Sequence, residues 1–253
     1  MNRTHRRLAA ALAVLFLLAP TLAGCGGDSG GRTQLTVLAA ASLTKTFEQL
    51  EESFEKEHPE VDVVISFGSS SALAEQINQG SPADVIATAD DNSIGLVADD
   101  GNLEAAPTKF ATNTLVVVTP PDNPADVSSV GDLAAADFVI CDPSVPCGSA
   151  AQAILDNAGV AATPKSLEAD VKAVLTKVSL GEADAGLVYV TDAKAAGDDV
   201  SALDIGADLN VVNPYYIAVV KDSDHSDLAD EWVSLVMSPA GQDVLAAAGF
   251  GMP

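Results

Sequence analysis

The fold is decided by the stretch Leu35-Thr36-Val37-Leu38-Ala39-Ala40-Ala41-Ser42-Leu43-Thr44, an apolar run that ends in three alanines and a serine. Apolar residues then recur at helical spacing from Leu43 to Phe54, and His58-Pro59 ends the pattern. We predict a strand that turns directly into a helix, with Ser42 near the helix N-cap. Such a junction combines free backbone N–H groups, the positive end of a helix dipole and a hydroxyl, which together suit an anion.

A second junction of the same kind follows. The run Val61-Asp62-Val63-Val64-Ile65-Ser66-Phe67 alternates apolar and polar residues and then becomes apolar, as a largely buried strand does. It leads into Gly68-Ser69-Ser70-Ser71 and a short helical pattern. Most single junctions of this kind are serine caps that bind nothing. Two of them are typical of the ligand crevice of an open α/β sheet.

Strands and helices alternate along the rest of the chain. The pattern predicts strands over 85–87, 113–119, 138–140, 185–189, 202–205 and 215–220, and helices over 148–157, 170–178, 226–237 and 239–248. This order indicates the α/β class, with mainly parallel sheets flanked by helices.

The first residues have the features of an export signal. Three arginines precede the apolar run 8–18, and Leu22-Ala23-Gly24-Cys25 follows, which resembles the lipoprotein box of bacteria. We predict a lipoprotein signal peptide over 1–24, lipidation of Cys25 and a flexible, glycine-rich tether over 25–32. An ordinary signal peptide and an uncleaved anchor are the alternatives, although the apolar run is short for a membrane-spanning helix.

The charge of the chain excludes one class of partner. The full sequence has 12 Lys and Arg against 36 Asp and Glu, a net charge of −24. Removal of the predicted signal peptide leaves nine basic residues and a net charge of −27. Nucleic acid is therefore not an expected partner, because its binding depends on neutralising phosphates. The mean field also repels small anions, so an anion site must use local dipoles.

Two cysteines remain once Cys25 is assigned to lipid. Cys141 and Cys147 flank the proline-stiffened loop Asp142-Pro143-Ser144-Val145-Pro146, in a chain destined for an oxidising compartment. We favour a disulfide, which would add about 2 kcal/mol by loop closure; two free thiols are the alternative. A metal site is not expected here because no histidine is near in the sequence.

With these elements in order, the chain resembles the molybdate-binding proteins of bacterial ABC importers. The matching segments run in the family's order from about residue 33 to the end: Ala39-Ala40-Ala41-Ser42-Leu43, Phe67-Gly68-Ser69-Ser70-Ser71-Ala72-Leu73, Pro82-Ala83-Asp84, Asn113-Thr114-Leu115-Val116-Val117-Val118, Asp142-Pro143, Val145-Pro146-Cys147-Gly148, Ala169-Asp170-Val171, Leu187-Val188-Tyr189 and Thr191-Asp192-Ala193. The resemblance implies a two-lobed periplasmic-binding-protein fold of type II. One lobe would comprise 33–115 with 214–253 and the other 116–213.

The resemblance also implies the binding residues. The family's ligand-binding positions correspond to Ser42 and Ser70 in the first lobe and to Cys147, Val171 and Tyr189 in the second. The three hydroxyls, with the backbone N–H groups of the first four residues, would enclose the oxyanion. Family members often have alanine where Cys147 stands, but a backbone donor tolerates this change. No cofactor, catalytic residue or directly bound metal is implied.

The chemistry of these five residues fits such a ligand. Molybdate at neutral pH is a dianion without a proton, so it needs donors only, and each bond to it contributes about 1.5–3 kcal/mol. Tungstate nearly matches molybdate in size and charge and is expected to bind too. Monoprotonated phosphate would need an acceptor and is disfavoured. Sulfate remains the alternative ligand. There are alternative structural roles for two of these residues. The Val171 side chain can belong to the apolar face of its helix, with only its N–H functional, and Tyr189 can be a packed aromatic residue whose hydroxyl is already hydrogen-bonded.

We therefore predict a monomeric lipoprotein on the outer face of the cytoplasmic membrane that captures molybdate and delivers it to an ABC permease and its ATPase. An enzyme is the alternative class. A serine nucleophile needs a base, but the mature chain has only His58 and His225, neither in a motif. The segment Gly68-Ser69-Ser70-Ser71-Ala72 also lacks the second glycine of a nucleophile elbow. Enzymatic activity is not expected.

Overall fold

Two five-stranded sheets organise the protein, whose structure is a computed structural model that describes residues 31–253. The predicted signal peptide, Cys25 and most of the predicted tether lie outside the described residues. Within residues 31–253, no helix has both the length and the apolar character needed to cross a membrane.

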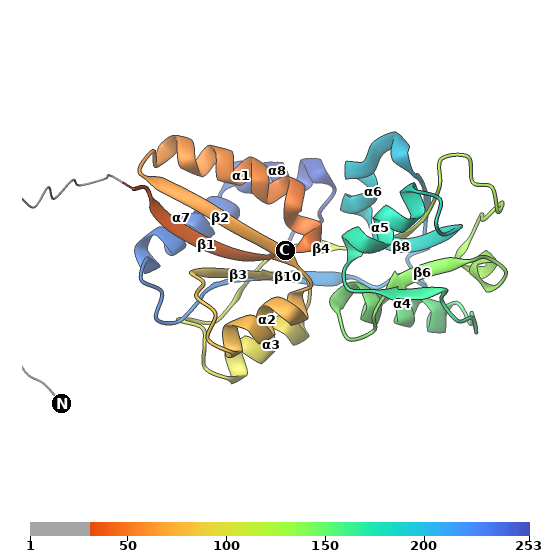
Figure 1. The fold of residues 1–253 in the computed structure, drawn as a ribbon, viewed down its shortest axis with the longest axis horizontal. Helices are drawn as coiled ribbons and strands as arrows, with labels where there is room; N and C mark the ends of the chain where they lie inside the picture. The colour runs from red at the N-terminus through yellow and green to blue at the C-terminus, as the bar shows by residue number, and fades with distance from the viewer. Residues whose placement is uncertain (1–30) are drawn as a thin grey trace, which may run out of the picture. The chain divides into compact units, whose positions relative to one another are not determined.

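The first sheet has the strand order β2-β1-β3-β10-β4. Its strands are β1 (Thr33–Ala40), β2 (Val61–Gly68), β3 (Val85–Thr88), β4 (Thr108–Asn113) and β10 (Asn213–Val219). Figure 1 shows helices on both faces of this sheet. One face carries α1 (Thr44–Glu57), α7 (Ser226–Met237) and α8 (Pro239–Ala248); the other carries α2 (Ser70–Asn78) and α3 (Asp91–Asp99). A short 3₁₀ turn, η1 (Ala41–Leu43), joins β1 to α1.

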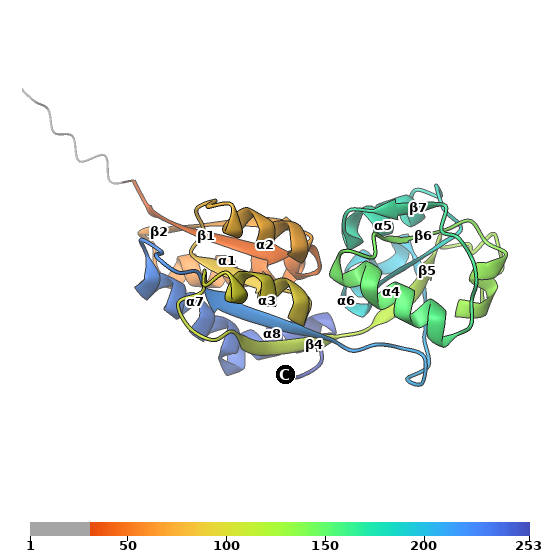
Figure 2. The same ribbon diagram turned by 90° about the horizontal axis from the view of Figure 1, so that it is seen from below.

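The second sheet has the order β7-β6-β8-β5-β9. Its strands are β5 (Leu115–Thr119), β6 (Phe138–Cys141), β7 (Ser166–Glu168), β8 (Ala185–Tyr189) and β9 (Ser201–Asp204). Helix α4 (Pro146–Asn157) covers one face, and α5 (Val171–Ser179) and α6 (Val190–Ala196) cover the other (Figure 2). The 3₁₀ turns η2 (Val130–Ala134) and η3 (Gly197–Asp199) lie in the connections.

One strand in each sheet is reversed. Strand β10 is antiparallel to both β3 and β4, and β5 is antiparallel to both β8 and β9, whereas the other neighbours pair in parallel. The reversed strands are those that the chain enters on arriving from the other sheet. Four of the five strands in each sheet thus share one direction, which confirms the predicted α/β class with mainly parallel sheets.

The chain crosses between the sheets at Thr114 and again between β9 and β10. Of the strand predicted over 113–119, residues 115–119 form β5, whereas Asn113 is the last residue of β4 in the other sheet. The rest of β4 and the short strand β7 were not predicted. Leu115 pairs with Tyr189 in the second sheet, and Asn213 pairs with Asn113 in the first. Leu115 was assigned to the first lobe but lies in the second sheet, and Asn213 was assigned to the second lobe but lies in the first sheet. The division into lobes remains a prediction.

Aromatic packing fixes α1 and α7 on the first sheet. The Trp232 ring of α7 is fully buried and meets Phe47 and Phe54 of α1 edge to face, with ring centroids 5.6 and 5.5 Å apart. Phe47 also packs against Phe110 of β4. Aromatic pairs of this geometry add to the free energy gained by burial. The apolar spacing that predicted α1 therefore also supplies the contacts that hold η1 and Ser42 in place.

We expect Phe47→Ala to lower the free energy of unfolding by about 3–5 kcal/mol, because it empties a buried aromatic site. Urea unfolding followed by circular dichroism measures the change. Leu96→Ala is the control: Leu96 is 48 % exposed, so its loss should change stability by less than about 0.5 kcal/mol. Equal unfolding midpoints for the two variants would contradict this account of the core.

Candidate functional site

All five residues predicted to bind the ligand line one small pocket. Ser42, Ser70, Cys147, Val171 and Tyr189 are each between 1 % and 6 % exposed. The cavity volume is about 20 Å³, slightly more than one water molecule needs and far below the roughly 300–1,000 Å³ of sites for drug-sized ligands. Only a compact ligand suits this pocket. That these residues contact a ligand remains a prediction.

The topology explains why these residues meet. Ser42 follows β1, and Tyr189 is the last residue of β8. Ser70 and Val171 are the first residues of α2 and α5, and Cys147 is the second residue of α4. Each position lies just beyond, or at, the carboxyl end of a strand that runs in its sheet's common direction. Such ends share one edge of a sheet, which is where open α/β sheets place their ligands.

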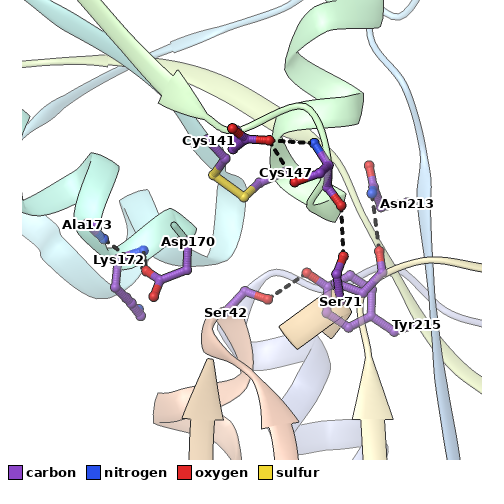
Figure 3. Close-up of a disulfide and its surroundings, with 12 residues drawn as sticks. Ser42, Ser71, Cys141, Cys147, Asp170, Lys172, Ala173, Asn213 and Tyr215 are labelled. Atoms are coloured by element: carbon purple, nitrogen blue, oxygen red, sulfur yellow. Dashed lines mark hydrogen bonds between the residues drawn. A yellow bond between two sulfur atoms is a disulfide. The ribbon is translucent and has the colours of Figure 1, made fainter. Parts of the chain in front are cut away.

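The contacts of the two serine hydroxyls leave each of them able to donate a proton into the pocket. The Ser70 Oγ accepts a hydrogen bond from the Ala89 N–H at 3.0 Å, which leaves the Ser70 proton available. The Ser42 Oγ lies 2.7 Å from the Tyr215 hydroxyl (Figure 3). The Asn113 side-chain amide donates to the Tyr215 oxygen at 3.5 Å, so the Tyr215 proton is available for Ser42. Ser42 can then donate its own proton into the pocket.

Tyr189 supplies a third hydroxyl. Its oxygen is buried and has no hydrogen-bond partner among residues 31–253. Burial in the first place, and then the nearby Tyr215, Asp90 and Asp192, raise the pKa of Tyr189 well above its usual value. The hydroxyl therefore stays protonated at physiological pH. A buried donor without a partner lowers the stability of the protein. A ligand that accepts a hydrogen bond from this hydroxyl would remove that penalty.

Backbone donors complete the pocket wall. Ser70, Cys147 and Val171 stand in the first turns of their helices, and Ser42 stands in η1. N–H groups in a first helical turn have no acceptor within the helix. They also lie at the positive end of the helix dipole. Residues from four separate helical starts thus line the pocket, and their N–H groups are the donors expected for a ligand.

A disulfide fixes the loop that presents the Cys147 N–H. Cys141 and Cys147, which the sequence left as a bridge or as two thiols, are joined (Figure 3). The Asp142 carboxylate accepts bonds from the Ser144 N–H at 2.9 Å and the Ser144 hydroxyl at 2.6 Å. Gly148 packs so closely that a Cβ there would lie 1.9 Å from the Asp142 carbonyl oxygen. Only glycine fits at this position.

Sequence reasoning missed three residues at the site. Asp170 lines the pocket, although its Oδ1 accepts bonds from the Lys172 and Ala173 N–H groups at 2.8 and 3.0 Å and so caps α5. An aspartate directly before a helical pattern was the signal for this cap. Tyr215 and Asn113, which orient Ser42, gave no signal, because nothing in a strand pattern distinguishes them.

Neither histidine that might have served as a base lies at the pocket. The His58 ring stacks on Phe54 with centroids 4.3 Å apart, and its Nε2 lies 3.3 Å from Glu231. His225 lines a separate groove with Asp84 and Ser223. Among the residues lining the pocket, no histidine stands beside Ser42 or Ser70, so these serines lack the partner that nucleophilic catalysis requires.

Known proteins resemble this chain over nearly its whole length. The family described as bacterial extracellular solute-binding protein matches residues 35–251. The molybdate-binding protein ModA of Mycobacterium tuberculosis is 42 % identical over 251 residues, which cover 95 % of this chain and 96 % of that protein.

Two solved structures share the fold. The periplasmic molybdate-binding protein of Azotobacter vinelandii gives a TM-score of 0.77 at 24 % identity, over 87 % of this chain and 99 % of that one. The sulfate-binding protein SubI of M. tuberculosis gives 0.76 at 17 % identity, over 87 % and 86 %. These likenesses confirm the predicted type of fold. Because both identities are low, they bear on the fold alone.

We expect Gly148→Ala to destabilise the protein by about 1–3 kcal/mol, because the new methyl group must displace the Asp142 backbone. Thermal unfolding by circular dichroism measures this. Gly95→Ala in α3 is the matched control: a Cβ at Gly95 meets nothing within 4 Å, and alanine is the better helix former by about 0.5–1 kcal/mol. An unchanged melting temperature for Gly148→Ala would show that the loop is not held as described.

Proposed function

The chain belongs to the family of bacterial extracellular solute-binding proteins, and from this premise we propose that it binds molybdate for an ABC importer. Members of this family bind solutes and are not enzymes, which confirms the prediction that this chain has no catalytic role. Substrate-binding proteins of importers act outside the cytoplasm.

The observation that carries the proposal is a pocket of donors with free protons. The oxygens of Ser42 and Ser70 already lie within hydrogen-bond distance of other donors, and the Tyr189 hydroxyl has no partner within the described chain. Four backbone N–H groups add to these three hydroxyls. Such a set favours an anion that carries no proton of its own. Molybdate meets this condition at neutral pH, whereas phosphate retains a proton that would need an acceptor.

Seven such donors supply enough free energy to hold a dianion without a cation. At about 1.5–3 kcal/mol each, they stabilise the ion by roughly 10–20 kcal/mol against the cost of its desolvation. Helix starts add about half a unit charge each. The Asp170 carboxylate opposes this attraction, but two N–H groups of α5 accompany its charge. The small cavity supports a compact tetrahedral ion.

The two sheets and the segments around them would act as two lobes, 33–115 with 214–253 and 116–213, that close over the ion. Two hydrogen bonds between the predicted lobes support this. The Ser71 hydroxyl donates to the Ser144 carbonyl at 2.8 Å, and the Lys194 ammonium donates to the Ala247 carbonyl at 2.7 Å. Further bonds cross the predicted boundary, among them that from the Asn113 amide to the Thr191 hydroxyl at 2.9 Å, and the lobes would separate only if these broke as well. The two crossing segments would then serve as the hinge.

The finer parts of the proposal concern anchoring and delivery. Cleavage after residue 24 and acylation of Cys25 would tether the protein, as a monomer, to the outer face of the cytoplasmic membrane. There it would deliver its ion to a permease driven by an ATPase. Tungstate would use the same donors because it matches molybdate in charge and closely in size. Sulfate remains the competing ligand, since the fold is shared with a sulfate-binding protein.

Titration calorimetry of the full chain, purified in detergent, tests the ligand. We expect saturable one-site binding of molybdate and tungstate, and much weaker binding of phosphate, because the phosphate proton would need an acceptor and the Asp170 carboxylate in the pocket wall already accepts two N–H bonds. Sulfate should bind more weakly than molybdate. Tight binding of sulfate or phosphate in the absence of molybdate binding would overturn the proposed ligand.

The double variant Ser42→Ala with Ser70→Ala tests the residues. Losing two hydrogen bonds to a charged ligand should weaken molybdate by about two to four orders of magnitude. Ser53→Ala on the exposed side of α1 should leave affinity unchanged. Circular dichroism shows whether the double variant keeps its fold. If a folded double variant binds as tightly as the wild type, the two serines are not ligands.

A further inference from the structure

A second pocket adjoins the first, and it is lined by basic residues although the protein as a whole is strongly acidic. We call it the lysine pocket, because Lys45, Lys172 and Lys194 line it; its cavity volume is about 250 Å³. Ser42 lines both pockets and forms part of the wall between them. Among the described residues, no acid lines the lysine pocket. A small anion in this pocket would therefore stand next to one of the proposed ligand residues.

The gathering of lysines is unusual for this chain. The sequence has eight lysines, and three of them meet here, although the net charge is −24. Other grooves on the described part of the chain carry acids: Asp84 lines one, Glu104 a second and Asp90 a third. The lysine pocket is therefore a local exception to the negative surface, and it lies beside the predicted anion site.

The three ammonium groups are not equally neutralised. Lys172 lies 2.7 Å from a carboxylate oxygen of the fully buried Asp192. Lys194 donates to an uncharged carbonyl, that of Ala247. Within residues 31–253, no carboxylate lies within ion-pair distance of Lys45. Among the described residues, Lys45 and Lys194 thus have no carboxylate within ion-pair distance, and one acid, Asp170, lines the neighbouring pocket.

Because salt screens distant charges, the charges nearest the pocket determine the electrostatic potential that an approaching ion meets. At physiological ionic strength the Debye length is about 8 Å, so most of the acids of the surface act weakly on an ion at the pocket mouth. Charges that line the pocket are within that range. Fixed charges of one sign in a cleft raise the local concentration of the opposite ion and its rate of association. The lysines thus offset, at this one place, the repulsion that the net charge imposes.

We propose that the lysine pocket is an outer anion site, through which molybdate reaches the pocket of Ser42, Ser70 and Tyr189. This inference rests on the proposed function. Lys45 and Lys194 attract the dianion, and Ser42 marks the passage to the inner pocket. Neither ammonium group lines the inner pocket. The outer site therefore raises the association rate constant and has little effect on the dissociation rate constant.

The experiment compares two identical charge changes on one helix. Lys45 and Lys56 are both exposed on α1, about 16 Å apart at 1.5 Å per residue. Lys45→Gln and Lys56→Gln alter the net charge equally, but only Lys45 lines the lysine pocket. Stopped-flow fluorescence of the full chain in detergent, mixed with molybdate, gives both rate constants at salt concentrations from about 0.05 to 0.5 M.

We expect Lys45→Gln to lower the association rate constant about threefold to tenfold at low salt, with dissociation changed less than about twofold. Lys56→Gln should change association by less than about twofold. The difference between the variants should vanish near 0.5 M salt, where the screening length is only a few ångströms. Lys45→Glu, which reverses the charge, should slow association further than Lys45→Gln.

Equal association rates for Lys45→Gln and Lys56→Gln, with wild-type affinity for molybdate intact, would overturn the outer site and leave the proposed function standing. A change confined to the dissociation rate would also overturn it, because Lys45 would then act on the bound ion. If the wild-type protein does not bind molybdate at all, the proposed function fails and the outer site fails with it.

Discussion

Donors without internal acceptors are the constraint on which the rest of this structure depends. Strands that share a direction end at a common edge of each sheet, and helical segments begin there. A helix start leaves its first N–H groups unpaired, and several such starts meet around one small pocket with three hydroxyls. Buried donors need an acceptor to offset the loss of water. A compact anion without a proton satisfies all of them at once.

The residues behind the pocket determine which way its hydroxyls point. The Ala89 N–H occupies the oxygen of Ser70, and Asn113 acts on Ser42 through Tyr215. Each contact allows the serine to donate its proton away from that partner. The disulfide and Gly148 position the backbone in a similar way, because they hold the loop before Cys147 in one conformation. These contacts would favour the fully deprotonated anion that we propose as the ligand.

The protein must also bring an anion to a strongly negative surface. Dipoles act over short distances, so they can hold an ion in the pocket but cannot draw it from solution. Full charges act over the Debye length, which is still only about 8 Å at physiological salt. In the arrangement we propose, the lysines beside the pocket attract the ion, and the dipoles inside the pocket hold it.

The sequence by itself determined the features that depend on residues close together along the chain. Apolar spacing identified the strand-to-helix junctions, although Ser42 lies within η1 and its side chain caps no helix. The matched segments carried Ser42, Ser70, Cys147, Val171 and Tyr189. The tertiary structure decided which distant residues meet. Tyr215 contacts Ser42 across 173 positions, Asp170 enters the pocket wall, and Lys45 joins Lys172 and Lys194. These meetings follow from the sheet order and from the reversed strands β5 and β10, which long-range pairing sets and no local pattern encodes.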